Sequence, residues 1–349
     1  MKTSKQQQEI KDITKEELAH WFETRGIRSF RAAQVLKWIY LRQADTFDQM
    51  TDINHKTREL LSYSFTNKRL GLTRKETSKD GSEKYLFQLD DGNTVESVLI
   101  PEKNHHTLCI SSQVGCAQGC RFCLTAKNGL VRNLAGWEII SQIRDIQNRL
   151  KDPVCLTNIV FMGMGEPLAN YQNVAHALKI ITDSDLGLKF SNRRVTLSTA
   201  GIVPKMKDLG KDTQVNLAVS LNAADNETRS RLMPINRKYP IEKLIEACAD
   251  YPLAPRKKIT FEYILIKGIN DSPEDAAHLA GILKKLPCKI NLIPYNAHED
   301  SPFERPDAST IANFQDVLVK RNYTAIIRYS KGSDISAACG QLRARSVGS

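Results

Sequence analysis

Three closely spaced cysteines constrain this chain more than any other feature of its sequence. Residues 115–123 read Gly115-Cys116-Ala117-Gln118-Gly119-Cys120-Arg121-Phe122-Cys123, so three residues and then two separate the successive cysteines. Three thiolates on one short loop can bind a single metal centre and leave it one protein ligand short of four. Since the 349 residues contain only eight cysteines in all, this clustering favours a metal or iron–sulfur centre. The alternatives are a zinc site completed by a distant histidine, or three small buried side chains.

The composition fits one large domain with a small appendage and favours a polyanionic partner. The chain has 50 Lys and Arg against 39 Asp and Glu, and its pI is near 9.2. No apolar run is long enough for a membrane helix, and the first residues, Met1–Gln6, are polar. We therefore expect a cytoplasmic protein without membrane attachment, in which the cysteines are ligands or reactive thiols rather than stable disulfides.

Residues 1–68 are predicted to form a helical accessory domain that binds RNA. Residues 1–75 carry 15 Lys and Arg against 9 Asp and Glu. This excess of six positive charges is more than half of the net charge of +11. Thr14 and Glu17 have the spacing of a capping box, Gly26 follows the first helix, and Ser29 is placed to cap a second helix. A third helical segment is expected near 55–65. The alternative is a structural scaffold whose basic face is merely solvated.

Residues 69–103 predict an antiparallel β extension, and residues 104–349 predict an α/β core. Asp80-Gly81 and Asp91-Gly92 supply the turns of the extension. In the core, apolar runs alternate with helical stretches, so six βα units with a parallel sheet are expected. The periodicity leaves open whether this sheet is curled or flat. The predicted strands lie near 108, 159–162, 195–197, 215–221, 259–266 and 290–294.

The cysteine spacing, with Phe122 before the third cysteine, resembles the signature of radical S-adenosylmethionine (SAM) enzymes. The flanking segments 108–116, 161–167 and 337–342 resemble the dual-specificity 23S rRNA and tRNA adenine C2 methyltransferases. The resemblance runs from the amino-terminal helices to about Leu342. It implies a partial (β/α)6 TIM-like barrel and a [4Fe-4S] cluster held by Cys116, Cys120 and Cys123. In this family, SAM occupies the open iron. A related family, which methylates C8 of the same ribosomal adenine, shares much of this pattern.

Polar residues just after the predicted strands are candidate SAM ligands, because ligands collect at the carboxyl ends of parallel strands. A glycine followed by a carboxylate, as in Gly165-Glu166, suits an ammonium group, and this segment lacks the third glycine of a dinucleotide-binding loop. The family has histidine where this chain has Asn222, and both side chains can donate a hydrogen bond. Each of these residues alone is typical of a turn or cap. The resemblance implies that SAM contacts Gly165, Glu166, Ser198, Ser220, Leu221, Asn222 and Asn296.

Two further cysteines and one glutamate receive roles from the resemblance. Cys339 lies in a stretch of small residues beyond the last predicted strand, and Cys109 lies on the strand that leads to the cysteine loop. The family implies that Cys339 carries the methyl group, that Cys109 is its resolving partner, and that Glu96 is the base. The other cysteines, at positions 155, 248 and 288, are interpreted as packing residues.

The reaction explains why a cluster, SAM and two further cysteines are needed. C2 of adenine is electron-poor and does not attack the SAM methyl group directly. The resemblance implies that one SAM methylates Cys339 and a second is cleaved to a radical, so two SAM are used per turnover. The expected partners are 23S rRNA, tRNA and an electron donor such as flavodoxin, and the expected state is a monomer. Three alternatives stay open: C8 methylation, a zinc-stabilised RNA-binding protein without catalysis, and a radical enzyme acting on a peptide or small molecule.

Overall fold

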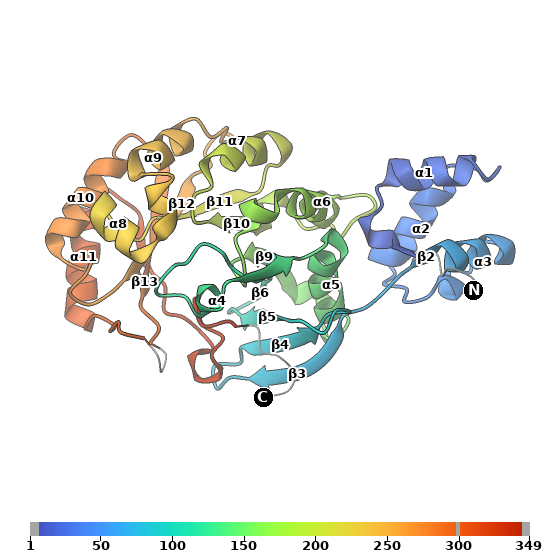
Figure 1. The fold of residues 1–349 in the computed structure, drawn as a ribbon, viewed down its shortest axis with the longest axis horizontal. Coiled ribbons are helices and arrows are strands. Elements are labelled where there is room, and N and C mark those ends of the chain that lie inside the picture. Colours follow the sequence, from blue (N-terminus) through green and yellow to red (C-terminus); the bar gives the residue numbers. More distant parts are fainter. Residues whose placement is uncertain (1–6, 298–300, 344–349) are drawn as a thin grey trace.

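The computed structural model describes residues 7–297 and 301–343, which form an amino-terminal helical lobe and a larger α/β body (Figure 1). The lobe contains α1 (Lys15–Glu23), α2 (Arg31–Tyr40) and α3 (His55–Ser64), and β1 (Gln8–Glu9) pairs with β2 (Phe65–Thr66) at its base.

The predicted capping box at the start of α1 is confirmed. The Thr14 side chain accepts from the Glu17 N–H, and the Glu17 carboxylate accepts from the Thr14 N–H. The prediction that Ser29 caps α2 is wrong, because Phe30 occupies the capping position with helical backbone angles. Ser29 lies one residue earlier, in a turn where its carbonyl accepts from the Ala32 N–H.

The lobe is attached to the body through the first turn of α5 (Gly136–Gln147). The residue before this helix is Ala135, whose methyl group cannot accept a hydrogen bond, so the helix lacks a cap of its own. Asp12, from the lobe, supplies the cap by accepting from the Trp137 N–H at 2.7 Å. A Cβ at Gly136 would lie 2.7 Å from the His176 ring, which belongs to the body, and 3.0 Å from the Asp12 carboxylate of the lobe, so the close packing of both requires glycine there.

The middle of α5 holds the lobe through a second, buried polar contact. The buried Arg144 guanidinium donates to the Ala44 carbonyl at 2.8 Å. Next to it, the Asp145 carboxylate accepts from the Leu70 N–H at 2.7 Å and from Arg69 at 2.6 Å. Because α5 belongs to the body, removing the lobe would leave the buried Arg144 without the Ala44 carbonyl, whereas Asp145 would keep its bonds to residues 69 and 70.

One ten-stranded sheet runs through the body, in the order β14-β13-β12-β11-β10-β9-β6-β5-β4-β3. Its antiparallel part contains β3 (Gly71–Thr77), β4 (Glu83–Gln88) and β5 (Thr94–Pro101), joined by the two predicted turns, and β5 pairs antiparallel with β6. The parallel part contains β6 (His106–Cys109), β9 (Leu156–Phe161), β10 (Val195–Thr199), β11 (Asn216–Ser220), β12 (Ile259–Leu265), β13 (Cys288–Pro294) and β14 (Ala325–Ile327).

The predicted fold class, a partial α/β barrel with a small helical lobe and a β extension, is confirmed. Two features differ from the prediction. The extension continues the barrel sheet through β5 and β6, and β14 adds a seventh parallel strand at the other edge. This strand is only three residues long, and so short an apolar run carries no usable period.

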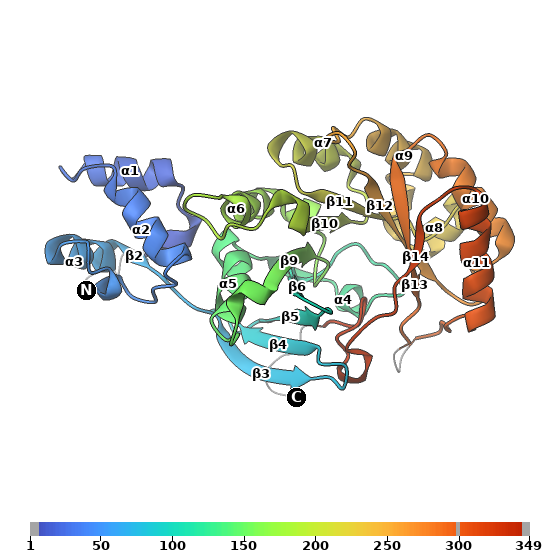
Figure 2. The same ribbon diagram turned by 180° about the vertical axis from the view of Figure 1, so that it is seen from behind.

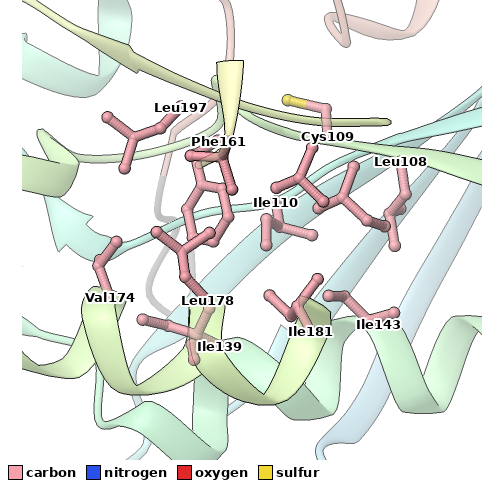
Figure 3. Packing of buried hydrophobic residues seen from close by; sticks show 14 of the residues in the cluster. Leu108, Cys109, Ile110, Ile139, Ile143, Phe161, Val174, Leu178, Ile181 and Leu197 are labelled. Carbon is pink, nitrogen blue, oxygen red and sulfur yellow. The ribbon is translucent and has the colours of Figure 1, made fainter. Parts of the chain in front are cut away.

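Helices pack on the outer face of the parallel strands (Figure 2). Figure 3 shows Ile139 of α5 and Leu178 and Ile181 of the helix that spans residues 171–182. These side chains pack against sheet residues such as Leu108. The sulfur of Cys109 points away from these helices, because successive residues of a strand face opposite sides. The covering helices, besides α5, are α6 (Tyr171–Thr182), α7 (Val203–Asp212), α8 (Asn226–Leu232), α9 (Ile241–Ala249), α10 (Pro273–Leu283) and α11 (Ala308–Lys320).

The segment after β14, residues 328–343, returns across the molecule to the β3–β4 side (Figure 1). We call this segment the C-terminal strap. Its Asp334 carboxylate accepts from the Ser78 hydroxyl at 2.6 Å, and its Ile335 carbonyl accepts from the Lys84 ammonium at 2.6 Å. The Gly332 N–H donates to Asp80 at 2.7 Å. The strap therefore links the two edge regions of the sheet.

Candidate active site

The three clustered cysteines lie on the loop between β7 (Gln113–Gly115) and β8 (Leu130–Asn133), which also contains the short helix α4 (Leu124–Lys127). Their side chains line one cavity of about 170 Å³. The other walls of this cavity are residues at the carboxyl ends of β9 to β13 and residues of the C-terminal strap. The structure therefore places the cysteine loop over the end of the barrel where ligands bind in parallel α/β folds.

The donor chemistry of this loop fits a bound metal cluster. Burial raises the pKa of Cys116 to about 12, and burial together with the charges of Cys123 and Cys116 raises that of Cys120 well above its usual value. Thiolates so close together in a poorly hydrated cavity need a cationic partner, which iron supplies. Within residues 7–297 and 301–343, no group of three or more His, Cys, Asp or Glu side chains is already arranged to hold a metal ion.

Arg229, from α8, is a buried cation beside this loop. Its guanidinium donates to the Ala200 carbonyl at 2.8 Å and to the Leu221 carbonyl at 3.0 Å, and it also donates to Asn236 at 2.9 Å. Burial lowers the pKa of Arg229 to about 10, while the nearby thiol of Cys120 acts in the opposite direction. Arg229 therefore ties together the ends of two barrel strands and places a positive charge near the cysteine loop.

Arg229→Met is expected to destabilise the fold by about 3 kcal/mol or more, because each buried carbonyl left without a donor costs about 1–3 kcal/mol. Urea denaturation followed by circular dichroism measures the loss. Arg231→Met, at an exposed position of the same helix, is the matched control and should stay within about 0.5 kcal/mol of the wild type. Equal stability of the Arg229 and Arg231 variants would show that Arg229 does not hold the strand ends.

Gly165 and Glu166 follow β9 and line the cavity. Gly165 has φ +101°, and a Cβ there would lie 2.6 Å from Gln113, so glycine is required by the protein's own packing. The Glu166 carboxylate is buried and accepts from the Thr199 hydroxyl at 2.7 Å and from the Ala200 N–H at 2.7 Å. Burial raises its pKa, and these hydrogen bonds act against the increase. The carboxylate, which also accepts from the Leu168 N–H at 3.0 Å, is thus fixed by protein donors at the cavity wall.

The other five predicted SAM contacts divide into two groups. Ser198, Ser220 and Asn222 line the cavity. Leu221 is fully buried and does not line it. Asn296 also lies outside the cavity wall, but its amide donates to the Ser330 hydroxyl at 2.8 Å and to the Cys339 carbonyl at 3.2 Å.

Asn222, which stands where the resembling family has histidine, has a left-handed backbone conformation with φ +59°. Asparagine adopts this conformation more readily than most residues. Its side-chain oxygen accepts from the Ile264 N–H at 2.9 Å, and its amide donates to the Met233 sulfur at 3.2 Å. The buried Asn222 side chain therefore joins the end of β11 to β12.

Cys339, on the C-terminal strap, lines the same cavity as the clustered cysteines and is exposed to solvent or ligand. Partial desolvation at the cavity raises the pKa of its thiol to about 11, with further contributions from the charges of Glu262 and Cys123. Cys109 lies on the inner face of the sheet, where its thiol accepts from the Met162 N–H. Burial raises the pKa of Cys109, and the charge of Cys339 raises it further. The charge of Cys339 therefore acts on Cys109, although their segments are far apart in sequence.

Glu96 lies on β5, buried beside the C-terminal strap. Its carboxylate accepts from the Arg343 N–H at 3.0 Å and lies 3.5 Å from the Lys84 ammonium. Burial raises the pKa of Glu96, and Lys84 acts against this increase. Glu96 does not line the cavity, so its contact is with the strap that carries Cys339.

The sequence analysis missed several cavity residues and misplaced one cysteine. Glu262 lines the cavity, and its signal was a carboxylate inside the apolar run of β12. Thr199 and Arg229 had no such signal. The prediction that Cys155 is a packing residue is wrong, because its thiol lies outside the core and hydrogen-bonds to Asp152 at 2.9 Å. Cys248 and Cys288 are buried, as predicted.

A larger cavity, of about 550 Å³, lies near the start of β13 at the opposite end of the barrel. It contains none of the predicted site residues. Its cations, Lys284 and Arg321 among them, follow the carboxyl ends of α10 and α11, where positive charge complements the helix dipole. The size of this cavity therefore does not indicate a second active site.

A partial α/β barrel with three cysteines on a loop above its strand ends is the arrangement expected of a radical SAM enzyme. The profile described as Radical SAM superfamily matches residues 110–280, and the profile described as Ribosomal RNA large subunit methyltransferase N-terminal domain matches residues 8–66.

Curated relatives and one solved structure cover nearly the whole chain. A "Dual-specificity RNA methyltransferase RlmN" from Desulfosudis oleivorans is 56% identical over 337 residues, which are 97% of this chain and 91% of that protein. A protein of the same name from Geotalea uraniireducens is 50% identical and covers 97% of both chains. The crystal structure of a radical SAM methyltransferase from Sphaerobacter thermophilus superposes with a TM-score of 0.90 at 41% identity, covering 96% of this chain and 99% of that one.

This chain belongs to the dual-specificity RNA methyltransferase family of radical SAM enzymes. It is therefore a SAM-dependent RNA methyltransferase, and the cofactors of the class are a [4Fe-4S] cluster and SAM. The membership removes two of the three alternatives, the zinc-stabilised RNA-binding protein and the radical enzyme acting on a peptide or small molecule.

Proposed function

We propose that this enzyme methylates C2 of one adenine in the peptidyl-transferase centre of 23S rRNA and of the adenine 3′ to the anticodon in tRNAs. The observation that carries the proposal is the pair formed by Cys109 and Cys339. The charge of Cys339 raises the pKa of Cys109, a thiol from a distant segment, and Cys339 lines the same cavity as Cys116, Cys120 and Cys123. A methyltransferase that passes the methyl group directly from SAM to its substrate needs no such pair.

The roles of the chain's own residues follow from this arrangement. Cys116, Cys120 and Cys123 hold the cluster, and Gly165, Glu166, Ser198, Ser220 and Asn222 line the space for SAM. Leu221 and Asn296 do not line this space and support it indirectly. The Leu221 carbonyl accepts from Arg229, and the Asn296 amide donates to the Cys339 carbonyl. When bound, the cluster and SAM supply the radical chemistry that takes hydrogen from the methyl group on Cys339.

Cys339 first accepts the methyl group on its sulfur and then delivers this carbon to C2, which joins the protein to the RNA. Glu96 removes the C2 proton. It is suited to this role because it lies beside the strap, where it accepts from the Arg343 N–H, and because the Lys84 ammonium lies only 3.5 Å from its carboxylate. Cys109 then attacks the Cys339 sulfur, so that a disulfide bond replaces the sulfur–carbon bond. The released carbon takes up a proton to become the methyl group, and the one electron left over from the radical addition would return to the cluster. Two SAM are consumed per turnover, and the adenine must leave its stack to reach the cavity.

The amino-terminal lobe is proposed to grip the RNA. Two arginines on its surface lie over tryptophan rings, Arg25 at 4.3 Å from Trp21 and Arg42 at 4.1 Å from Trp38. Exposed cations next to aromatic rings suit phosphates and unstacked bases.

None of the helices in residues 7–297 and 301–343 combines the length and apolarity needed to cross a membrane. The remaining expectations, an electron donor such as flavodoxin, a monomeric state and a cytoplasmic location, are part of the same proposal.

The double variant Arg25→Gln/Arg42→Gln is expected to weaken RNA binding and to lower the salt slope of log K. Each lost phosphate contact reduces this slope by about 0.9 for a duplex or about 0.7 for a single strand. Substitution is preferable to deleting the lobe, which would expose the polar contacts of α5. Filter binding across a salt series measures the slope, with Lys179→Gln, an exposed cation of α6, as the control. An unchanged slope in the double variant would make the lobe a scaffold.

Nucleoside analysis tests the site of methylation. Ribosomal and transfer RNA from cells lacking the gene should contain no 2-methyladenosine at the proposed positions, and the plasmid-borne gene should restore it. If the plasmid-borne gene produced 8-methyladenosine and not 2-methyladenosine, this result would support the C8 alternative and overturn the proposed regiochemistry.

A further inference from the structure

Glu262 is a carboxylate inside an apolar strand, and none of the steps above uses it. It lies on β12 between Phe261 and Tyr263, which are fully buried. Because residues of a strand alternate between its two faces, these aromatic rings point into the helix layer and Glu262 points into the barrel. There its side chain lines the same cavity as Cys339.

The surroundings of Glu262 leave it able to accept a proton. Its carboxylate accepts one hydrogen bond, of 3.0 Å, from the Asn291 amide on β13. Burial raises its pKa to about 7, while Asn291 and the positive charges of Arg328 and Lys289 act against this increase. A carboxylate has about four acceptor positions, so capacity remains on the cavity side.

Cys339 needs such an acceptor. With a pKa of about 11, its thiol carries a proton at neutral pH, and the thiolate is the nucleophilic form. Glu262 and Cys339 line the same cavity, and the charge of Glu262 contributes to the raised pKa of the thiol. A carboxylate on the wall of the same cavity can take this proton directly.

The other two carboxylates near the site are less suited to this task. Glu166 already accepts from the Thr199 hydroxyl and the Ala200 N–H. Glu96 is bonded to the Arg343 N–H, lies beside Lys84, and is outside the cavity wall.

We propose that Glu262 is the base that takes the proton from Cys339 when this thiol accepts its methyl group from SAM. The inference rests on the proposed role of Cys339 as methyl carrier. A bond forms between Sγ and the methyl carbon while the bond from that carbon to the sulfonium sulfur breaks, and the thiol proton moves to the Glu262 carboxylate. The products are methylated Cys339, the neutral thioether S-adenosylhomocysteine and a neutral Glu262, so the positive and negative charges of the reactants cancel and no redox partner is required.

The variant Glu262→Gln keeps the size of the side chain and removes its charge and basicity. Two rates are measured on the Cys339 peptide by mass spectrometry, using anaerobically purified holoenzyme. The first is alkylation by iodoacetamide without added SAM, and the second is the single-turnover gain of one methyl group after SAM is added. Glu262→Gln is expected to alkylate several-fold faster at pH 8, because loss of the neighbouring charge lowers the pKa of the thiol. It is expected to accept the methyl group about 100-fold more slowly or worse, because the proton acceptor is gone.

The opposite signs of the two effects separate a base from other roles. If Glu262 were only a neighbouring charge, both rates would rise, and if it only supported the fold, both would fall; either result overturns the proposal. Glu262→Asp should recover part of the methyl transfer, and Glu304→Gln, which removes an exposed carboxylate bonded to Lys267, should change neither rate. A wild-type enzyme that gains no methyl group on Cys339 would instead refute the proposed function itself.

Discussion

Cys109→Ala is expected to remain covalently bonded to RNA, whereas Cys339→Ala is expected to form no covalent complex. Without Cys109, the enzyme can still methylate Cys339 and attach it to adenine, but no thiol remains to displace the Cys339 sulfur from the new carbon. Without Cys339, the methyl group has no carrier and the RNA is never attached. The loss of product should be complete within detection in both variants, although only one of them retains the RNA.

Denaturing gel electrophoresis with labelled RNA separates these outcomes, since the complex survives denaturation. The double variant of Cys109 and Cys339 should behave as Cys339→Ala does. Cys288→Ala is the matched control, because it removes a buried thiol outside the cavity and should cost about 1 kcal/mol of stability without trapping RNA. Normal turnover by Cys109→Ala, with no trapped species, would overturn both role assignments even if the cluster assignment holds.

Replacing any one of Cys116, Cys120 and Cys123 by alanine is expected to abolish both the cluster and SAM cleavage. Two thiolates on this loop cannot hold a four-iron cluster that already keeps one iron open. Iron analysis of anaerobically purified protein should give about four irons per chain for the wild type and close to none for each variant. The brown colour should disappear along with 5′-deoxyadenosine formation.

Cys155→Ala provides the control for the cluster cysteines, because this thiol bonds to Asp152 and lies outside the cavity. It should retain the iron, the colour and SAM cleavage. A full iron complement in any variant of Cys116, Cys120 or Cys123 would refute the assignment of that cysteine as a ligand. Stoichiometric zinc in the wild type would refute the cluster for the whole loop.

The sequence was most informative where a structure depends on neighbouring residues. The capping box of Thr14 and Glu17, the turns at Gly81 and Gly92 and the apolar runs of the parallel strands are local patterns, and each appears in the structure. The cysteine loop belongs to this group, since its three thiols reach one cavity through their spacing alone.

The remaining parts of the fold and site depend on contacts that no local pattern encodes. The cap that Asp12 provides to α5 comes from another part of the chain, and the position of Glu96 depends on where the strap ends. The proximity of Cys109 and Cys339 came only from the family resemblance, because nothing in either segment points to the other. Glu262 did leave a local trace, a charge in an apolar strand, but a buried carboxylate of this kind can also be one that is paired within the core.

The C-terminal strap has a consequence for how the site can open. The sheet ends at β14 on one side and at β3 on the other, and across this gap the strap is held by side-chain contacts such as Asp334 with Ser78 and Lys84 with the Ile335 carbonyl. These contacts, and others such as the Leu124 N–H with the Gly340 carbonyl, lie outside the strand ladders, so the strap can separate from its neighbours while every ladder of the sheet stays intact. The free energy of opening is thereby separated from the free energy of unfolding. In the proposed function, the residue that meets the RNA is carried on this segment and not on a strand of the barrel.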